Sequence, residues 1–132
     1  KTKSHNMQMK AIDIDDWANA WFKAFKEITN PNSQFTHQQV PKKLTCKDGF
    51  TFSIQAGPTH YSTPKALADH YDAFEIGFPS ASEPIWNQWQ EDPDQDPTES
   101  IYGWVPSDII NHVIEFHGGI DPENFVLEKL VK

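Results

Sequence analysis

The first apolar repeat in the chain predicts an amphipathic helix between residues 14 and 28. Its apolar residues recur at intervals of three and four, which places them on one helical face: Trp17, Trp21, Ala24, Phe25 and Ile28. The aspartates Asp13, Asp15 and Asp16 supply a cap and suit the positive end of the helix dipole. Asn30-Pro31-Asn32 is predicted to end the helix, and the polar stretch 33–43 is predicted to be irregular.

Three segments further along have the pattern of β-strands. Residues 50–56 alternate apolar and polar side chains directly after the turn dipeptide Asp48-Gly49, and residues 44–47 are the predicted hairpin partner. Residues 73–78 are predicted as a second main strand, with one face formed by Phe74, Ile76 and Phe78. The apolar run 101–105 is short enough to be a third strand.

Shorter helices are predicted between and after these strands. Pro64 is predicted to begin one that runs through Ala66, Leu67, His70 and Tyr71, and Ser82 to cap another that contains Ile85, Trp86 and Trp89. Pro106 occupies the place of a first helical residue, and Gly118-Gly119 gives that helix a left-handed end. Asp121-Pro122 predicts a terminal helix with Phe125, Leu127, Leu130 and Val131.

Together these elements predict an α+β fold. We expect one small antiparallel sheet of three or more strands with helices packed on one face, because each strand alternates and one side must be covered. A chain of 132 residues has the size of a single domain. Residues 1–10 are expected to form a flexible N-terminal tail, and residues 11–132 the domain.

The charge pattern narrows the choice of partners. Acidic residues outnumber basic ones 19 to 11, the formal net charge is −8, and every basic residue is a lysine. Without arginine, a negatively charged chain is repelled by nucleic acid unless a local patch such as Lys42, Lys43 and Lys47 overrides the net field. A partner protein with a basic surface is therefore expected, and no direct contact with nucleic acid or membrane.

A single cysteine, Cys46, allows no internal disulfide, so a reducing, cytoplasmic location is expected. No apolar run has the character of a signal peptide or of a membrane span.

The densest charged feature is the acidic segment 91–99. Asp92, Asp94 and Asp96 have the spacing of the first ligands of a calcium loop, but Pro97 and Gly103 stand where such a loop needs glycine and glutamate. The segment is then either a solvated loop or an acidic arm that docks on a basic partner. The partner-binding residues predicted from this second interpretation are Glu91, Asp92, Asp94, Asp96 and Glu99, together with the flanking aromatic residues Trp86, Trp89 and Tyr102.

Other aromatic residues are assigned to the core: Trp17, Trp21, Phe74, Phe78 and Trp104. The histidines show no metal-ligand spacing, and we expect neither a metal nor a cofactor. Catalysis is the less favoured class, because neither Cys46 nor Ser62 or Ser80 has a local nucleophile signature. If the chain is a small hydrolase of nucleic acid or nucleotide, the residues are expected to be His60, His70 and Asp72.

Several short motifs between residues 52 and 120 resemble small accessory proteins encoded by phages and prophages. They are Phe52-Ser53-Ile54-Gln55-Ala56, His60-Tyr61, Glu75-Ile76-Gly77-Phe78-Pro79-Ser80, Tyr102-Gly103-Trp104-Val105-Pro106 and His117-Gly118-Gly119-Ile120. The resemblance implies a context of host-defence evasion, in which small acidic proteins such as anti-CRISPR inhibitors cover basic nucleic-acid channels. A non-enzymatic inhibitor of a defence nuclease is thus the first expectation, and a particle-assembly component is the alternative.

Overall fold

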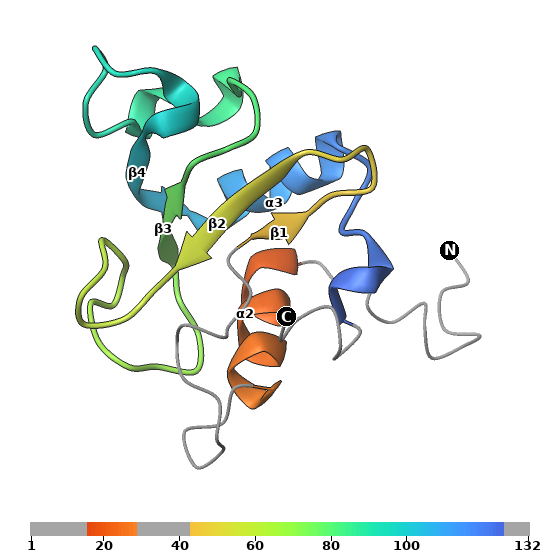
Figure 1. Cartoon of the computed structure of the whole chain (residues 1–132). Helices are drawn as coiled ribbons and strands as arrows, with labels where there is room; N and C mark the ends of the chain where they lie inside the picture. Colours follow the sequence, from red (N-terminus) through yellow and green to blue (C-terminus); the bar gives the residue numbers. More distant parts are fainter. Residues whose placement is uncertain (1–15, 29–42, 126–132) are drawn as a thin grey trace.

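The computed structural model describes residues 16–28 and 43–125 (Figure 1). In chain order the elements are α2 (Trp17–Ile28), β1 (Leu44–Thr45), β2 (Thr51–Gln55), β3 (Ala73–Gly77), the 3₁₀ helices η3 (Pro84–Trp89) and η4 (Pro97–Glu99), β4 (Ile101–Pro106), α3 (Ser107–Phe116) and the 3₁₀ helix η5 (Pro122–Phe125). Several predictions lie outside the described residues: the tail 1–10, the caps Asp13 and Asp15, the helix end 30–32, nearly all of the stretch 33–43, and the terminal helix beyond Phe125.

The four strands form one antiparallel sheet in the order β1-β2-β3-β4. Its pairs alternate between two faces. Ile54 pairs with Ile76, which pairs with Tyr102, and all three are buried. One residue along, Ser53 pairs with Gly77, which pairs with Ile101 on the opposite face. One face of the sheet is therefore apolar and the other carries small and polar side chains.

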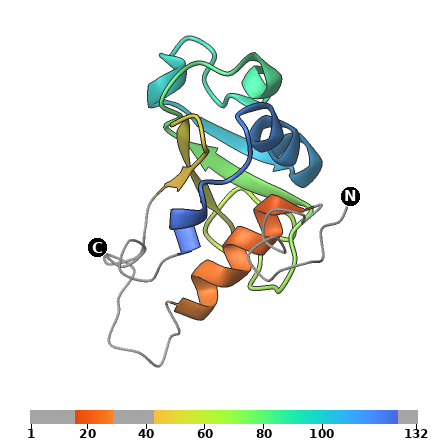
Figure 2. The ribbon, with the colours of Figure 1, turned by 90° about the vertical axis from the view of Figure 1, so that its right-hand side faces the viewer.

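Helices α2 and α3 both cover the apolar face, as Figure 2 shows. The core joins residues from both helices to the strands, among them Trp21, Phe52, Phe74, Ile110 and Val113. Two hydrogen bonds of the Asn111 side chain connect α3 to α2. Asn111 accepts from Ala18 N–H at 2.9 Å and donates to Asp16 at 3.0 Å. The α+β prediction, with helices packed on one face of a small antiparallel sheet, is confirmed.

Both edges of the sheet are covered by other parts of the chain. At the β1 edge, Lys47 N–H donates to the carbonyl of Gly119 at 2.9 Å. At the β4 edge, Glu91 N–H donates to Ile101 and Trp104 N–H donates to Tyr61. A covered edge does not recruit a further strand, so side-chain surfaces and not strand addition are the places to look for a partner.

The local turn signals are confirmed where the chain is described. Asp16 caps α2 through a hydrogen bond from Asn19 N–H at 3.2 Å. Gly49 closes the β1-β2 hairpin with φ of 97°, and Gly118 and Gly119 end α3 with φ of 93° and 96°. These three glycines adopt left-handed backbone that other residues enter at a cost.

The helix predicted from Pro64 to Tyr71 is wrong, because this segment forms a loop. Tyr71 is buried but Leu67 is 83% exposed, so the segment has too few core contacts to sustain so short a helix. The loop is closed at its base, where Asp72 N–H donates to Thr63 at 2.8 Å. The cap of η3 also differs from the prediction: Glu83, not Ser82, accepts from Ile85 N–H at 3.1 Å.

Candidate functional site

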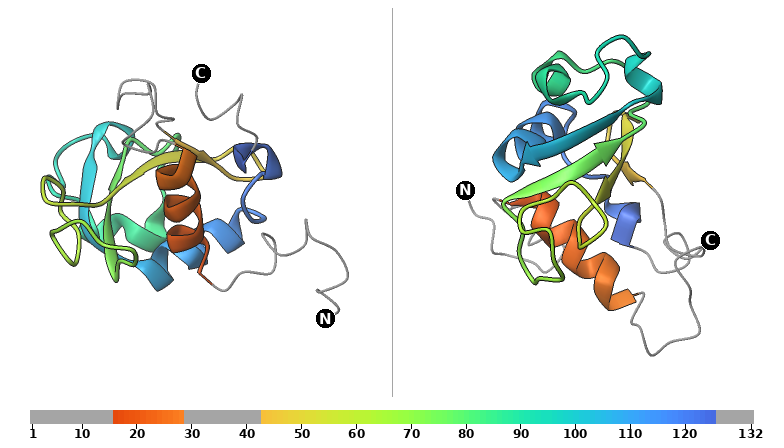
Figure 3. Two further views of the ribbon diagram at one scale, coloured as in Figure 1. Left: turned by 90° about the horizontal axis from the view of Figure 1, so that it is seen from below. Right: turned by 90° about the vertical axis from the view of Figure 1, so that its left-hand side faces the viewer.

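The acidic loop, defined here as residues 91–99, lies at the opposite end of the molecule from α2 (Figure 3). Its acidic residues are all exposed: Glu91, Asp92, Asp94, Asp96 and Glu99. All five carboxylates predicted to face a partner are therefore accessible to one.

Hydrogen bonds within the acidic loop give it a defined shape. Asp92 accepts from Asp94 N–H at 3.1 Å, and Asp96 caps η4 by accepting from Thr98 N–H at 2.8 Å. The bonds from the Thr98 hydroxyl and N–H lower the pKa of Asp96, so this carboxyl stays ionised at neutral pH. Asp92 and Asp96 stabilise the shape of the acidic loop. The side chains of Glu91, Asp94 and Glu99 take no part in these hydrogen bonds.

The acidic loop is also pinned to the body of the domain. The Gln90 side-chain amide donates to Gln95 O and to Ser100 Oγ, both at 2.8 Å. The hydroxyl of Tyr102, a buried residue of β4, donates to Pro97 O at 2.8 Å. A loop fixed in this way loses little conformational entropy when it binds.

Two of the predicted aromatic contact residues are core residues, and this part of the prediction is wrong. Trp86 and Tyr102 have no exposed surface, and the Trp86 ring packs edge-on against Phe52 with centroids 5.0 Å apart. Trp89 is partly buried against the same core. Burial, with a contribution from Asp96, raises the pKa of Tyr102, so its hydroxyl remains a donor. Trp86 and Tyr102 therefore support the acidic loop from inside.

The exposed rings near the acidic loop are others. Phe78 and Trp104, both assigned to the core from the sequence, are each 45% exposed, and Tyr61 is 38% exposed. Tyr61 and Trp104 stack with centroids 4.7 Å apart and planes 21° apart. Alternation predicts Phe78 as buried, but β3 ends at Gly77, and the backbone of both Phe78 and Trp104 departs from strand geometry.

Phe78 and Trp104 both have positive φ, at 50° and 53°. Left-handed backbone costs a bulky residue about 1–2 kcal/mol. At Trp104 it accompanies a bulge in β4, where the pairing shifts between Phe74 and Ile76 of β3. Bulges and strained residues concentrate at functional sites because they redirect side chains, and here they turn two rings outward.

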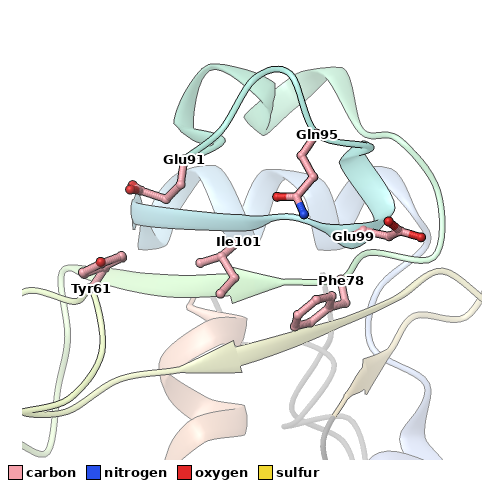
Figure 4. Close-up of a pocket in the computed structure, with 6 residues that line it drawn as sticks. All are labelled: Tyr61, Phe78, Glu91, Gln95, Glu99 and Ile101. Atoms are coloured by element: carbon pink, nitrogen blue, oxygen red, sulfur yellow. The ribbon is translucent and has the colours of Figure 1, made fainter.

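A groove lies between the acidic loop and the open face of the sheet, with a volume of about 470 Å³. Figure 4 shows its lining: Ile101 lies in the middle between Tyr61 and Phe78, Gln95 points down toward it from the acidic loop, and Glu91 and Glu99 lie at the two ends of that loop. The groove thus combines an apolar centre, two aromatic rings and two carboxylates.

Two lysines of the chain lie beside the aromatic rings of this groove. Lys65 Nζ is 5.0 Å from the Tyr61 ring centroid, and Lys43 Nζ is 6.0 Å from that of Phe78. The Lys43 ammonium also donates to Phe78 O at 2.7 Å. Each of the two rings therefore has a lysine ammonium over it at cation–π distance.

Of the three residues of the hydrolase alternative, the structure brings His70 and Asp72 together and places His60 beside Glu75. His70 lies 3.9 Å from Asp72 with both side chains well exposed, whereas His60 lies 3.5 Å from Glu75. Ser62 is buried and its hydroxyl donates to Pro64 O at 2.8 Å.

The thiol of Cys46 is likewise in the core. Burial, followed by the charge of Asp48, raises the pKa of Cys46 to about 12. Such a thiol is protonated at neutral pH and is not a nucleophile.

His117, the residue that follows α3, links three parts of the fold. His117 Nδ1 lies 2.6 Å from Asp48 Oδ2, and Nε2 lies 2.7 Å from Glu83 Oε1. The ring stacks on Phe50 with centroids 4.1 Å apart. Burial lowers the pKa of His117, but its hydrogen bonds to the two carboxylates outweigh burial and raise that pKa above its ordinary value. His117 acts as a cationic clamp between the hairpin turn, η3 and α3.

Within residues 16–28 and 43–125, no group of three His, Cys, Asp or Glu side chains is arranged to hold a metal ion. Neither of the described α-helices is long and apolar enough to cross a membrane.

Comparisons with protein-family models, with curated proteins and with solved structures find no match to this chain. No relative therefore indicates what the acidic loop and its groove bind, and their own residues are the basis for a proposal.

Proposed function

We propose that this protein works by binding and not by catalysis, and that the acidic loop docks on a basic surface of a partner protein. The observation that carries the proposal is the fixed display of five exposed carboxylates beside exposed aromatic rings. Rings that anchor and charges that steer are the two components of a protein-binding surface.

The rigidity of the acidic loop favours binding over simple solvation. A solvated loop has no need of anchors, yet this one is held by Gln90, Ser100 and Tyr102. The carboxylates are therefore presented at defined positions, which suits complementarity to fixed basic residues.

The partner that we propose is a host defence nuclease or a CRISPR surveillance complex, in the cytoplasm of the host cell. Support for this context comes from the resemblance of residues 52–120 to phage-encoded accessory proteins and from the net charge of −8. Nucleic-acid channels are positively charged, so an acidic protein seated over one competes with the phosphate backbone. The protein then acts as a stoichiometric inhibitor and a mimic of nucleic-acid charge.

The test is affinity capture from a host lysate with three baits: the wild type, a loop variant and a control variant. The loop variant is Glu91→Gln, Asp94→Asn and Glu99→Gln, which keeps the capping residues Asp92 and Asp96. The control variant neutralises three exposed acids outside the acidic loop: Asp72→Asn, Asp108→Asn and Glu115→Gln. Each variant changes the net charge from −8 to −5, by +3, so only the position of the lost charge differs.

We expect the wild type and the control variant to capture the same salt-sensitive nucleoprotein or nuclease, and the loop variant to lose it. Equal capture by both variants would contradict docking through the acidic loop. Self-association without a partner would point to particle assembly, and nucleotide turnover that depends on His70 would point to a hydrolase; either result would refute the proposal.

A further inference from the structure

We propose that the Asp48-Gly49 peptide in the β1-β2 hairpin is a site of isoaspartate formation, and that the contact between Asp48 and His117 controls the rate of this modification. In isoaspartate the main chain passes through the side-chain carboxyl carbon of the aspartyl residue. The inference does not depend on the proposed function, because it concerns the hairpin and not the acidic loop.

The reaction is intramolecular and needs only water. The Gly49 amide nitrogen attacks the side-chain carboxyl carbon of Asp48 and forms a C–N bond. The amide hydrogen and the hydroxyl of the protonated carboxyl leave together as water, which gives a cyclic succinimide. Water then adds at either carbonyl of the ring and opens it to aspartate or to isoaspartate. The water lost in the first step returns in the second, so the modified residue has the same atoms as the original one.

The sequence and the exposure of the turn favour this site. Asp48 is the one aspartate of the chain that precedes a glycine, and no asparagine precedes one. Glycine has no Cβ to hinder the approach of its nitrogen. A Cβ built on Gly49 would meet no atom within 4 Å, and the side chain of Asp48 is 49% exposed. Water therefore has access to the place where the succinimide would form.

In the native hairpin each of the two reacting groups has another partner. Gly49 N–H, on the attacking nitrogen, donates to Cys46 O at 2.9 Å. Asp48 Oδ1 accepts from Phe50 N–H at 3.0 Å, and Oδ2 lies 2.6 Å from His117 Nδ1. The bonds from Phe50 N–H and His117 lower the pKa of Asp48, so its carboxylate stays ionised at neutral pH. An ionised carboxylate reacts poorly, because its oxygen leaves as water only after protonation.

Of the partners of Asp48, His117 is the one that connects the turn to the rest of the fold. Figure 1 shows the hairpin beside the end of α3, where Asp48 N–H also donates to His117 O at 3.3 Å. The His117 side chain is itself held, because it is 15% exposed and Nε2 lies 2.7 Å from Glu83 Oε1. The bonds of Asp48 and Gly49 to Cys46 and Phe50 lie within the hairpin, and a hairpin by itself is only marginally stable. Release of His117 therefore frees the turn to reach the reactive geometry.

Isoaspartate at residue 48 would change the hairpin permanently. It adds one carbon atom to the main chain between β1 and β2, and the register of a hairpin depends on the length of its connection. The carboxyl carbon that bears the acceptor of His117 becomes part of the main chain. The modification thus converts a reversible opening of the His117 clamp into an irreversible one.

The experiment is peptide mapping by liquid chromatography and mass spectrometry after prolonged incubation of the whole protein. Isoaspartate has the mass of aspartate and is recognised by its shifted retention, whereas the succinimide is lighter by one water. The samples are the wild type, His117→Gln and Asn111→Ala, which weakens the fold through a different contact. The two variants are compared at urea concentrations that give them the same unfolded fraction.

We expect isoaspartate at residue 48 to form at least about tenfold faster in His117→Gln than in the wild type, because local opening of the turn becomes easier. Asn111→Ala is expected to react more slowly than His117→Gln at the same unfolded fraction. The native wild type is expected to react at least about tenfold more slowly than the same chain unfolded in urea.

Each part of the proposal has its own contrary result. Equal rates in the two variants would mean that global unfolding controls the reaction, and would overturn the role of His117. Equal rates in the native and the unfolded wild type would overturn protection by the hairpin, whether or not His117→Gln folds. Absence of isoaspartate at residue 48 from every sample, the unfolded chain included, would overturn the site itself.

Discussion

The substitution His117→Gln tests whether the histidine clamp holds three parts of the fold together. In the wild type both ring nitrogens lie within 2.7 Å of a carboxylate oxygen. A neutral ring carries one N–H and would direct a lone pair at the other carboxylate, so the imidazolium is the form that satisfies both. Glutamine keeps a polar side chain but not the charge.

The cost follows from the burial of Glu83. Its side chain is 5% exposed, so loss of the imidazolium leaves a buried carboxylate without its cation. Breaking a buried pair in this way costs several kcal/mol, and because Glu83 keeps its bond from Ile85 N–H we expect the low end, about 2–3 kcal/mol. In thermal unfolding this corresponds to a decrease in Tm of roughly 10 °C.

The pH dependence has a defined sign. The pKa of His117 is raised above its ordinary value of 6.5. The contribution of His117 to the free energy of unfolding is therefore fully present below pH 6.5 and is lost as the pH rises through the folded-state pKa. The bonds from Phe50 N–H and His117 lower the pKa of Asp48 below 3.8, so the Asp48 contribution is present above 3.8 and is lost as the pH falls through the lowered value. The difference in free energy of unfolding between the wild type and His117→Gln is therefore largest between pH 3.8 and pH 6.5, and it decreases toward high pH.

The assay is urea unfolding followed by tryptophan fluorescence at about pH 5.5 and about pH 8.5. The control is His112→Gln, which alters an exposed histidine on the same helix. Equal losses of stability for the two variants, or a gap that widens as the pH rises, would refute the clamp.

Three further predictions concern the core and the groove. Cys46, with a pKa of about 12, should react with a disulfide reagent only after denaturation, and rapid labelling of the native protein would contradict its burial. Gly103→Ala should disturb the near-ultraviolet circular dichroism of the Tyr61 stack at a stability cost under about 1 kcal/mol, because a Cβ at residue 103 would lie 3.2 Å from the Tyr61 ring; an unchanged spectrum would count against this close packing. Asn111→Ala removes the acceptor of Ala18 N–H and should cost about 1–2 kcal/mol in urea unfolding, and an unchanged midpoint would argue against the link between the helices.

Sequence reasoning predicts best where one local signal decides the structure. The Asp48-Gly49 hairpin and the diglycine end of α3 depend on turn geometry that only a few residues adopt. The strand β2 follows from alternation, which reports burial of one face, whereas β3 is buried at four of its five positions and follows from its apolar run. The segment 64–71 fails for the converse reason, because a helical pattern without enough partners in the core does not become a helix.

The residues of the candidate site differ in the same way, because the acidic ones could be predicted from the sequence and the aromatic ones could not. Its acidic residues follow from composition alone, because a dense run of carboxylates has to be exposed. Its aromatic residues do not: Trp86 beside the acidic loop is buried, while Phe78 and Trp104 within apolar strand patterns face outward. Periodicity assumes regular backbone, and the positive φ angles of Phe78 and Trp104 break that assumption.

The clamp of His117 also needs the three-dimensional structure. Its partners, Asp48 and Glu83, lie 69 and 34 residues away along the chain, so no spacing rule connects them. Spacing along the sequence could show only that the histidines lack a metal-ligand arrangement.

The most direct test of the central claim is the dissociation constant of the captured partner, measured against salt concentration for the wild type, the loop variant and the control variant. We predict that the wild type and the control variant bind alike, with affinity that falls steeply as salt rises, and that the loop variant binds at least about tenfold more weakly with a shallower dependence. Equal affinity and equal salt dependence for all three proteins would contradict binding through the acidic loop.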